Sequence, residues 1–277
     1  MIFDLPKTAK EKVIIVAHRG TFGGNIPCNV IPSFETALKQ GADMIEIDVD
    51  MSVDGKLFIF HPGKESEHLG VNTRIEEMKS EEIKKLRYLN YDRTETQFGL
   101  NTLDELLETF KGRCYINVDK FWGYPKEIYE EIKKHNMQEQ VLVKSKPSKK
   151  VLSVLNEIAP ELPYMSVVHT EHPMHETLMK SNLNYIGAEV IFESEDEEVA
   201  SDEFIARMHK DNKLLWVNSI IYDYKQQLTA GHSDDTALCT SSDDGWGWLV
   251  KKGYDIIQTD WPIMLKNYLS ENNMLYK

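Results

Sequence analysis

The sequence predicts an α/β fold, and more specifically a closed (β/α)8 TIM barrel, on three observations. Apolar strand-like runs alternate with helix-like segments, which is typical of a parallel sheet. Parallel strands are predicted to begin near residues 13, 44, 114, 141, 164, 185, 214 and 255, and eight strands are the number that closes such a barrel. The alternative is an open doubly wound sheet, but no strand is followed by the glycine-rich Gly-x-Gly-x-x-Gly turn.

The predicted strands are short apolar runs, several of them rich in β-branched residues, as expected for strands that are buried on both faces. Val53-Asp54-Gly55 is a turn signal, so segments 44–51 and 57–61 are predicted to pair as a hairpin outside the barrel count. The strands are predicted at 13–17, 44–51, 57–61, 114–119, 141–144, 164–168, 185–192, 214–217 and 255–258.

Capping residues indicate where helices begin and end. Ser33 can cap the first helix and Gly41 ends it, while Thr102 and Glu105 are spaced as a capping box. Helices are predicted at 33–39, 80–86, 103–110, 125–135, 148–158, 175–181, 201–210, 246–252 and 262–270. We expect one barrel domain over 1–277, with an irregular insertion at about 62–100 and a polar loop with helical portions at 222–244.

Composition limits the classes of partner. The net charge of −13 gives no field that attracts nucleic acid. The chain has 3 widely spaced cysteines, which predict neither a disulfide framework nor a zinc site. No signal peptide fits before the first strand and no apolar run is long enough to span a bilayer. We therefore expect a cytoplasmic protein without stable membrane insertion; the oligomeric state is not predicted.

Two carboxylates share one face of the second strand. Glu46 and Asp48 are spaced i, i+2, so both side chains point toward the barrel interior or its upper rim. A solvated pair of acids is the alternative, but their apolar strand neighbours argue against it. Buried together, the two carboxylates repel each other, and a hard divalent cation such as Mg²⁺ or Ca²⁺ would relieve that repulsion.

Two histidines and an arginine follow the ends of neighbouring apolar runs. His18 and His61 stand in the same relation to two different strands, so they can flank one phosphorus atom as acid and base. Arg19 can bind phosphate oxygens with two parallel hydrogen bonds. This grouping suits phosphodiester cleavage with a divalent metal.

The order and spacing of these residues resemble the glycerophosphodiester phosphodiesterase family, within the phospholipase-C-like phosphodiesterase barrels. The resemblance extends over most of the chain, and its early part is the more specific. It rests on His18-Arg19-Gly20, GADMIEIDV at 41–49, DGKLFIFH at 54–61, TLDELL at 102–107, LWVN at 215–218 and GYDIIQTDWP at 253–262. It implies a TIM barrel, one divalent cation (Mg²⁺ or Ca²⁺), His18 and His61 as acid and base, and a small glycerophosphodiester substrate that yields glycerol 3-phosphate and an alcohol. It also implies metal ligation by Glu46, Asp48 and a third acid on the next barrel strand.

The chain departs from the family pattern near the expected site. The family's Pro-Glu-Asn-Thr is here Pro-Cys-Asn-Val at 27–30, and Pro62 replaces the aspartate after the second histidine. The family's Glu-x-Lys on the third barrel strand is here Asn117-Val118-Asp119. Either Asp119 or Asn117 can then be the third metal ligand, and we expect Asp119 because it carries the charge.

Three further residues are candidates for the site. Lys144 at the end of a strand could replace the missing lysine, or it could extend to the surface. Glu189, inside an apolar strand, could be an additional metal ligand or face a helix. Trp216 could wall the alcohol pocket, although core packing is the commoner use of a strand tryptophan.

Other functions remain open at this point. A barrel phospholipase C or D acting on lipid phosphodiesters shares the histidine chemistry. A catalytically weakened barrel that only binds phosphate esters stays a possible alternative because of the altered third strand. A glycosidase needs two acids on opposite sides of a sugar, whereas Glu46 and Asp48 are on one strand. The sequence does not identify the alcohol, the metal or the histidine that acts as base.

Overall fold

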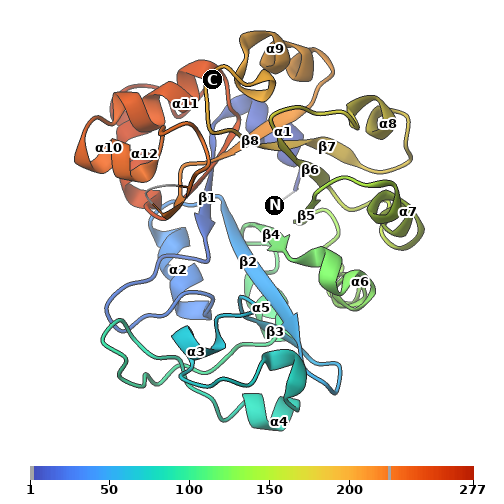
Figure 1. Ribbon diagram of the computed structural model, residues 1–277, viewed down its shortest axis with the longest axis vertical. Coiled ribbons are helices and arrows are strands. Elements are labelled where there is room, and N and C mark those ends of the chain that lie inside the picture. Colours follow the sequence, from blue (N-terminus) through green and yellow to red (C-terminus); the bar gives the residue numbers. More distant parts are fainter. Residues whose placement is uncertain (1–2, 224–225) are drawn as a thin grey trace.

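A computed structural model describes residues 3–223 and 226–277. Its parallel strands close into a barrel, because β1 pairs with β2 on one side and with β11 on the other (Figure 1). The predicted TIM barrel is therefore confirmed. The barrel strands are β1 (Ile14–His18), β2 (Met44–Met51), β4 (Tyr115–Asp119), β5 (Val141–Ser145), β6 (Tyr164–His169), β7 (Tyr185–Ile191), β8 (Leu214–Asn218) and β11 (Ile256–Thr259).

Helices surround the ring of strands in Figure 1, and those predicted from the sequence are present within a few residues of their expected bounds. The predicted capping box is confirmed, because the Glu105 amide donates to Thr102 Oγ1 at 3.2 Å and the Thr102 amide donates to Glu105 Oε2 at 2.8 Å. The predicted helices are α2 (Ile31–Lys39), α4 (Ser80–Ile83), α5 (Leu103–Phe110), α6 (Pro125–Lys134), α7 (Lys149–Ile158), α8 (His175–Met179), α9 (Asp202–Lys210), α11 (Trp248–Lys252) and α12 (Pro262–Glu271).

The predicted hairpin is confirmed: β2 pairs antiparallel with β3 (Leu57–Ile59). The turn between them contains Gly55 at φ +81°, in the left-handed region that favours glycine. Because β3 ends at residue 59, His61 lies just beyond it. The Phe60 amide donates to the Asp48 carbonyl at 3.1 Å, so the backbone holds this histidine beside the acidic strand.

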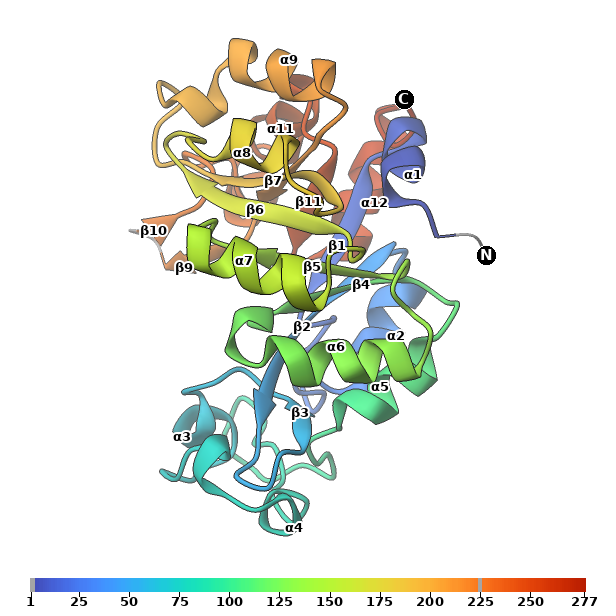
Figure 2. The ribbon, with the colours of Figure 1, turned by 90° about the vertical axis from the view of Figure 1, so that its right-hand side faces the viewer.

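Residues 62–100 form a lobe at the edge of the barrel, below it in Figures 1 and 2. The lobe contains α3 (Glu65–His68) and α4. It has a small apolar core of its own, which reaches the barrel through Val30 and Phe58. The other members of this cluster are Phe60, Leu69, Ile75, Met78, Ile83, Tyr88 and Leu100.

A short helix that the sequence analysis missed covers the end of the barrel at which the strands begin. Leu5 and Ala9 of α1 (Leu5–Glu11) belong to the same buried apolar cluster as the interior residues Trp216 and Met165. In Figure 2 α1 lies beside the C-terminal segment, where the Lys277 amide donates to the Glu11 carbonyl at 3.0 Å. We therefore expect the reactive side chains at the opposite end, where the strands finish.

The polar stretch predicted at 222–244 is more ordered than expected. It begins in an antiparallel pair, β9 (Ile221–Asp223) with β10 (Gln226–Gln227), and contains α10 (Asp234–Cys239) and the π-helical turn Asp243–Gly247. Residues 224–225 of the predicted loop lie outside the described residues. Among the helices of the described ranges, none combines the length and apolarity needed to cross a bilayer.

Candidate active site

Three carboxylates meet where strands β2 and β4 end. Oxygen atoms of Glu46, Asp48 and Asp119 all lie within 4.8 Å of one another. Strand register explains this, since Glu46 pairs with Asn117 and Asp48 with Asp119 across the two parallel strands. Glu46 is 3% exposed and Asp48 is 0% exposed, so most of this negative charge is buried.

These oxygen donors fit a hard divalent cation. Asp48 Oδ1 and Asn117 Oδ1 are buried without a hydrogen-bond partner among the described residues. Burial and the charge of Asp48 raise the pKa of Glu46 to about 7. Burial also opposes ionisation of Asp119, but Lys120 and Lys144 outweigh it and hold its pKa below the usual range. A cation held by the carboxylates would give Asp48 Oδ1 a partner, and the amide oxygen of Asn117, which pairs with Glu46 across the two strands, is a candidate further donor.

Arg19 is held against the carboxylates at the start of the β1–α2 loop. Its Nε lies 2.9 Å from Asp48 Oδ2, and its amide donates to Glu46 Oε2 at 3.0 Å. The next residue, Gly20, has φ +80°, and a Cβ there would come within 2.5 Å of Ser33 Oγ. Only glycine allows this close turn, which brings the guanidinium back over β2.

The segment that departs from the family pattern, Pro-Cys-Asn-Val at 27–30, also reaches the acids. Asn29 Nδ2 donates to Asp48 Oδ2 at 2.9 Å. Burial raises the pKa of the Cys28 thiol to about 12, so this thiol is neutral where the family pattern has a glutamate. The site thus has one acid fewer on this loop than the family pattern has.

The two histidines line the same cavity as Glu46 and Asp119. His18 is the last residue of β1, and His61 Nε2 lies 4.0 Å from Asp48 Oδ1. The Pro62 carbonyl lies 3.0 Å from His61 Nδ1, so Nδ1–H donates to it and Nε2 faces the acids. Burial lowers the pKa of His61. Burial alone would lower the pKa of His18 as well, but the hydrogen bond to Asp260 and the charges of Asp260 and Glu46 together outweigh burial and raise this pKa.

Asp260, which the sequence analysis did not single out, orients His18. Its Oδ1 lies 2.9 Å from His18 Nδ1. Behind it, the buried carboxylate of Asp234 accepts the Asp260 amide at 2.9 Å, Trp246 Nε1 at 2.7 Å and the Ser219 hydroxyl at 2.6 Å. The sequence did hold a signal for this residue. Asp260 lies one residue after the final strand, within the segment 253–262 that resembles the family.

For a reaction in which His18 transfers a proton, replacing Asp260 by asparagine is expected to lower kcat about 10- to 100-fold while the protein stays folded. The amide removes the negative charge that raises the His18 pKa, so the limb of the pH–rate profile that belongs to His18 should move to lower pH. Steady-state kinetics between pH 5 and 9 check this. An unchanged profile would mean that Asp260 does not act through His18.

Lys144, Glu189 and Trp216 form a separate group inside the barrel. Lys144 Nζ lies 2.5 Å from Glu189 Oε2 and 3.8 Å from the Trp216 ring centroid. Asn218 Nδ2 donates to Glu189 Oε1 at 2.6 Å. Lys144 therefore points inward, and Glu189 pairs with it and lies outside the group of three acids. Trp216 is fully buried below Lys144 and does not line the cavity.

The cavity over these residues has a volume of about 930 Å³ and opens at the strand C-termini. Besides the acids and histidines, its walls include Lys64, Lys120, Trp122 and Tyr222. Lys120 adopts φ +59° and pairs with Asp119 at 2.7 Å. The cavity thus joins a compact acidic centre to walls that hold lysines and aromatic side chains besides Glu193 and Glu197. The lysines and aromatic groups suit an anionic ester with an organic substituent.

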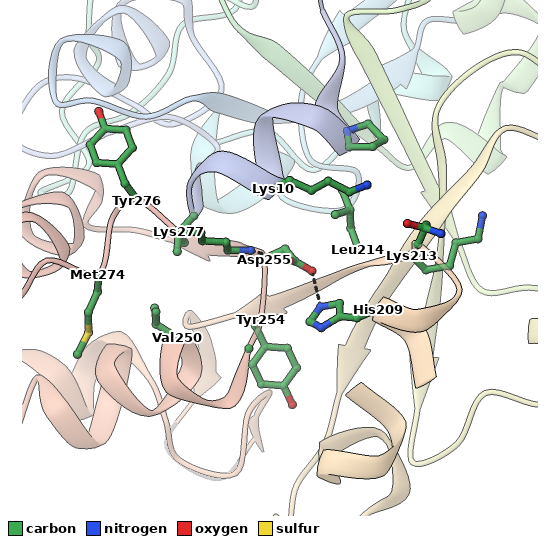
Figure 3. A pocket seen from close by; sticks show the side chains of 14 residues that line it. Lys10, His209, Lys213, Leu214, Val250, Tyr254, Asp255, Met274, Tyr276 and Lys277 are labelled. Carbon is green, nitrogen blue, oxygen red and sulfur yellow. Dashed lines mark hydrogen bonds and ion pairs between the residues drawn. The ribbon is translucent and has the colours of Figure 1, made fainter. Parts of the chain in front are cut away.

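A second cavity, of about 530 Å³, lies at the opposite end of the barrel (Figure 3). There Asp255 accepts from His209 Nε2 at 3.0 Å and from the Lys277 ammonium. Figure 3 shows His209 directed at Asp255, so the carboxylate ties α9 and the C-terminal segment to β11. These groups pair with one another, so we interpret the contacts at this end of the barrel as stabilising the fold.

Sequence comparisons relate the chain to known proteins over part of its length. A family described as a domain of unknown function matches residues 164–269. Glycerophosphodiester phosphodiesterases of Bacillus altitudinis and Bacillus subtilis (strain 168) are 32% and 29% identical over 47% and 58% of this chain. The alignments cover 57% and 61% of the length of these relatives, which is less than two thirds.

Solved structures share the fold. A glycerophosphoryl diester phosphodiesterase from Parabacteroides distasonis superposes with a TM-score of 0.78 and 19% identity, covering 95% of this chain and 88% of that one. A phosphodiesterase from Oleispira antarctica, in complex with the product sn-glycerol-3-phosphate, gives 0.67 and 19%, covering 94% and 97%. The sequence matches confirm the resemblance to the glycerophosphodiester phosphodiesterases, and the solved structures confirm the barrel fold.

Proposed function

We propose that the chain is an enzyme that hydrolyses glycerophosphodiesters to glycerol 3-phosphate and an alcohol, with the help of one divalent cation. The observation that carries this proposal is that His18, His61, Glu46 and Asp119 line one cavity at the strand C-termini, with the buried Asp48 within 4.8 Å of both acids. The sequence relatives named for this activity support it, as does the structural neighbour that holds glycerol 3-phosphate. Its cytoplasmic location stays a prediction.

Glu46, Asp48 and Asp119 would hold the cation, and the orphaned amide oxygen of Asn117 is available as a further donor. All of these donors are oxygens, which suits Mg²⁺ or Ca²⁺. When bound, the ion would polarise the phosphoryl oxygens and offset the charge that develops on them. Glu189 would serve in a different way, by keeping the Lys144 ammonium inside the barrel.

The histidines would divide the proton transfers. One imidazole takes a proton from the attacking group, which is water or the neighbouring glycerol hydroxyl, and the other donates a proton to the departing alcohol. Where the glycerol hydroxyl attacks, the first product is a cyclic phosphate, and water then opens it to glycerol 3-phosphate. Arg19, and Lys144 as a replacement for the family's strand lysine, would offset the negative charge of the phosphate. Trp216 would contribute indirectly, since its buried ring supports Lys144.

A product-release assay tests this function. The full chain is incubated with a panel of glycerophosphodiesters that differ in the alcohol, and glycerol 3-phosphate is measured enzymatically. We expect product from at least one substrate, its loss on adding EDTA, and its recovery with excess Mg²⁺ or Ca²⁺. Product that is unaffected by the chelator would contradict the metal requirement, and no product with any metal would contradict the enzyme itself.

A barrel that binds phosphate esters without turnover is the second candidate, because Asn117 and Asp119 replace the family's Glu-x-Lys. Calorimetric binding of the same panel, without product release over hours, would favour it. In that case glycerol 3-phosphate itself should bind as well as the diesters do.

A further inference from the structure

The cavity at the end of the barrel where the strands begin has a volume of about 530 Å³, which suits a small organic ligand (Figure 3). Helix α1, the turn between α9 and β8, the turn before β11 and the segment after α12 all contribute to its walls. Its inner surface is largely apolar, because the lining residues Val13, Leu214 and Tyr254 are at most 5% exposed. None of the described lining residues is shared with the catalytic cavity, so the two cavities are separate.

The acidic side chain that lines this cavity already has its partners. Among the described lining residues, Asp255 has the one carboxylate side chain. Its Oδ2 accepts from the Leu215 amide at 2.9 Å and lies 3.0 Å from His209 Nε2, while its Oδ1 pairs with the Lys277 ammonium. Burial opposes its ionisation, but these partners outweigh burial and hold the pKa of Asp255 below its usual range. Asp255 therefore has little capacity left to balance other positive charges around the cavity.

Two lysines of the cavity wall have no carboxylate partner. Within the described ranges neither Lys10 nor Lys213 forms an ion pair, and Lys213 Nζ donates instead to the Tyr185 carbonyl at 2.6 Å. Burial lowers the pKa of Lys213, and the charge of Asp211 offsets only part of that effect. Figure 3 shows the two lysines beside Leu214, on the same side of the cavity. On a chain with a net charge of −13, this local excess of positive charge favours an anion.

We propose that this cavity binds a small organic carboxylate, with the carboxylate held by Lys10 and Lys213 and the apolar part of the ligand against the inner surface. A carboxylate offers one oxygen to each ammonium, and such charge-assisted hydrogen bonds are stronger than neutral ones. The apolar part gains free energy by leaving water, which an inorganic anion cannot do. Because the two cavities are separate, this inference does not depend on the proposed hydrolysis, and either can fail without the other.

Binding of a fluorinated aromatic acid tests the site directly. The affinity of the full chain for para-fluorobenzoate is measured by fluorine NMR and compared with that for the neutral para-fluorobenzamide and the positive para-fluorobenzylammonium. We expect the benzoate to bind about tenfold or more tightly than the benzamide, and the ammonium not to bind. Acetate, which lacks the ring, should compete about tenfold or more weakly than the benzoate. Equal affinities for the benzoate and the benzamide would overturn the proposal.

Charge changes locate the bound carboxylate. Lys10→Glu should weaken para-fluorobenzoate binding about tenfold or more, and Lys213→Gln, which removes one charge, about three- to fivefold. Lys7→Glu is the matched control, because Lys7 is exposed on the preceding turn of α1 and does not line the cavity, so the same charge change should alter the affinity less than about twofold. Lys10 is exposed as well, so its replacement should leave the fold intact, which circular dichroism checks. Equal losses in Lys7→Glu and Lys10→Glu would contradict a defined site.

A variant of the catalytic cavity tests the alternative location. Lys64→Glu changes a lysine that lines the catalytic cavity, and it should leave para-fluorobenzoate binding unchanged within about twofold. If the affinity falls in Lys64→Glu and not in Lys10→Glu, the carboxylate binds in the catalytic cavity and our proposal is wrong. A failure to hydrolyse any diester would contradict the proposed function and would leave these binding expectations unchanged.

Discussion

Replacing His61 by alanine is expected to lower kcat for glycerophosphodiester hydrolysis about a thousandfold, and replacing His18 should cost as much. The reason is that each imidazole would carry one of the two proton transfers, and general acid–base catalysis contributes about 10²–10⁴-fold. KM should change little, because the phosphate-binding charges of Arg19 and Lys144 are untouched. Steady-state kinetics on the best substrate of the panel measure both effects.

His169→Ala is the matched control for these variants, since His169 lines the rim of the same cavity and is exposed. It should retain activity within a few-fold. The His18 and His61 variants should also bind the divalent cation as the unmodified chain does, which shows that the site is intact. Full, metal-dependent activity in both histidine variants would refute the catalytic assignment.

The barrel and much of the site could be predicted because they depend on local pattern. A buried parallel strand is a short apolar run, and the i, i+2 spacing of Glu46 and Asp48 places both side chains on one face. His61 could be placed through the turn at Gly55, which pairs β3 with β2 and returns the chain to Asp48. In each case the sequence of one strand or one hairpin is enough to predict where the side chain lies.

Other parts depend on contacts between distant residues, and the sequence pattern did not reveal them. The ion pair of Lys144 with Glu189 joins β5 to β7, and either residue alone reads equally well as a surface or helix-facing group. Asp260 reaches His18 across the closure of the barrel, from the last strand to the first. The α1 helix has too few turns for an amphipathic period to stand out.

The largest effect on metal binding is expected from Asp48→Asn and Asp119→Asn, each of which should weaken Mg²⁺ or Ca²⁺ binding about 100-fold or more. Each change removes one of three charges that converge within 4.8 Å, and the buried oxygen that replaces it is neutral. Calorimetric titration of the metal-free protein, with circular dichroism to show that the fold is kept, measures the loss.

The same titration decides between the two candidate ligands of the third strand. Asn117 Nδ2 donates to the Leu142 carbonyl at 3.2 Å, so only its oxygen is available to a cation, and Asn117→Ala should weaken binding by about tenfold or less. Glu189→Gln is the matched control, because this carboxylate pairs with Lys144, and it should leave metal affinity unchanged while raising KM. A larger loss in Asn117→Ala than in Asp119→Asn would make the amide the principal ligand. The negative charge at position 119 would then serve mainly to hold Lys120 beside the phosphate, since the two side chains already form an ion pair at 2.7 Å.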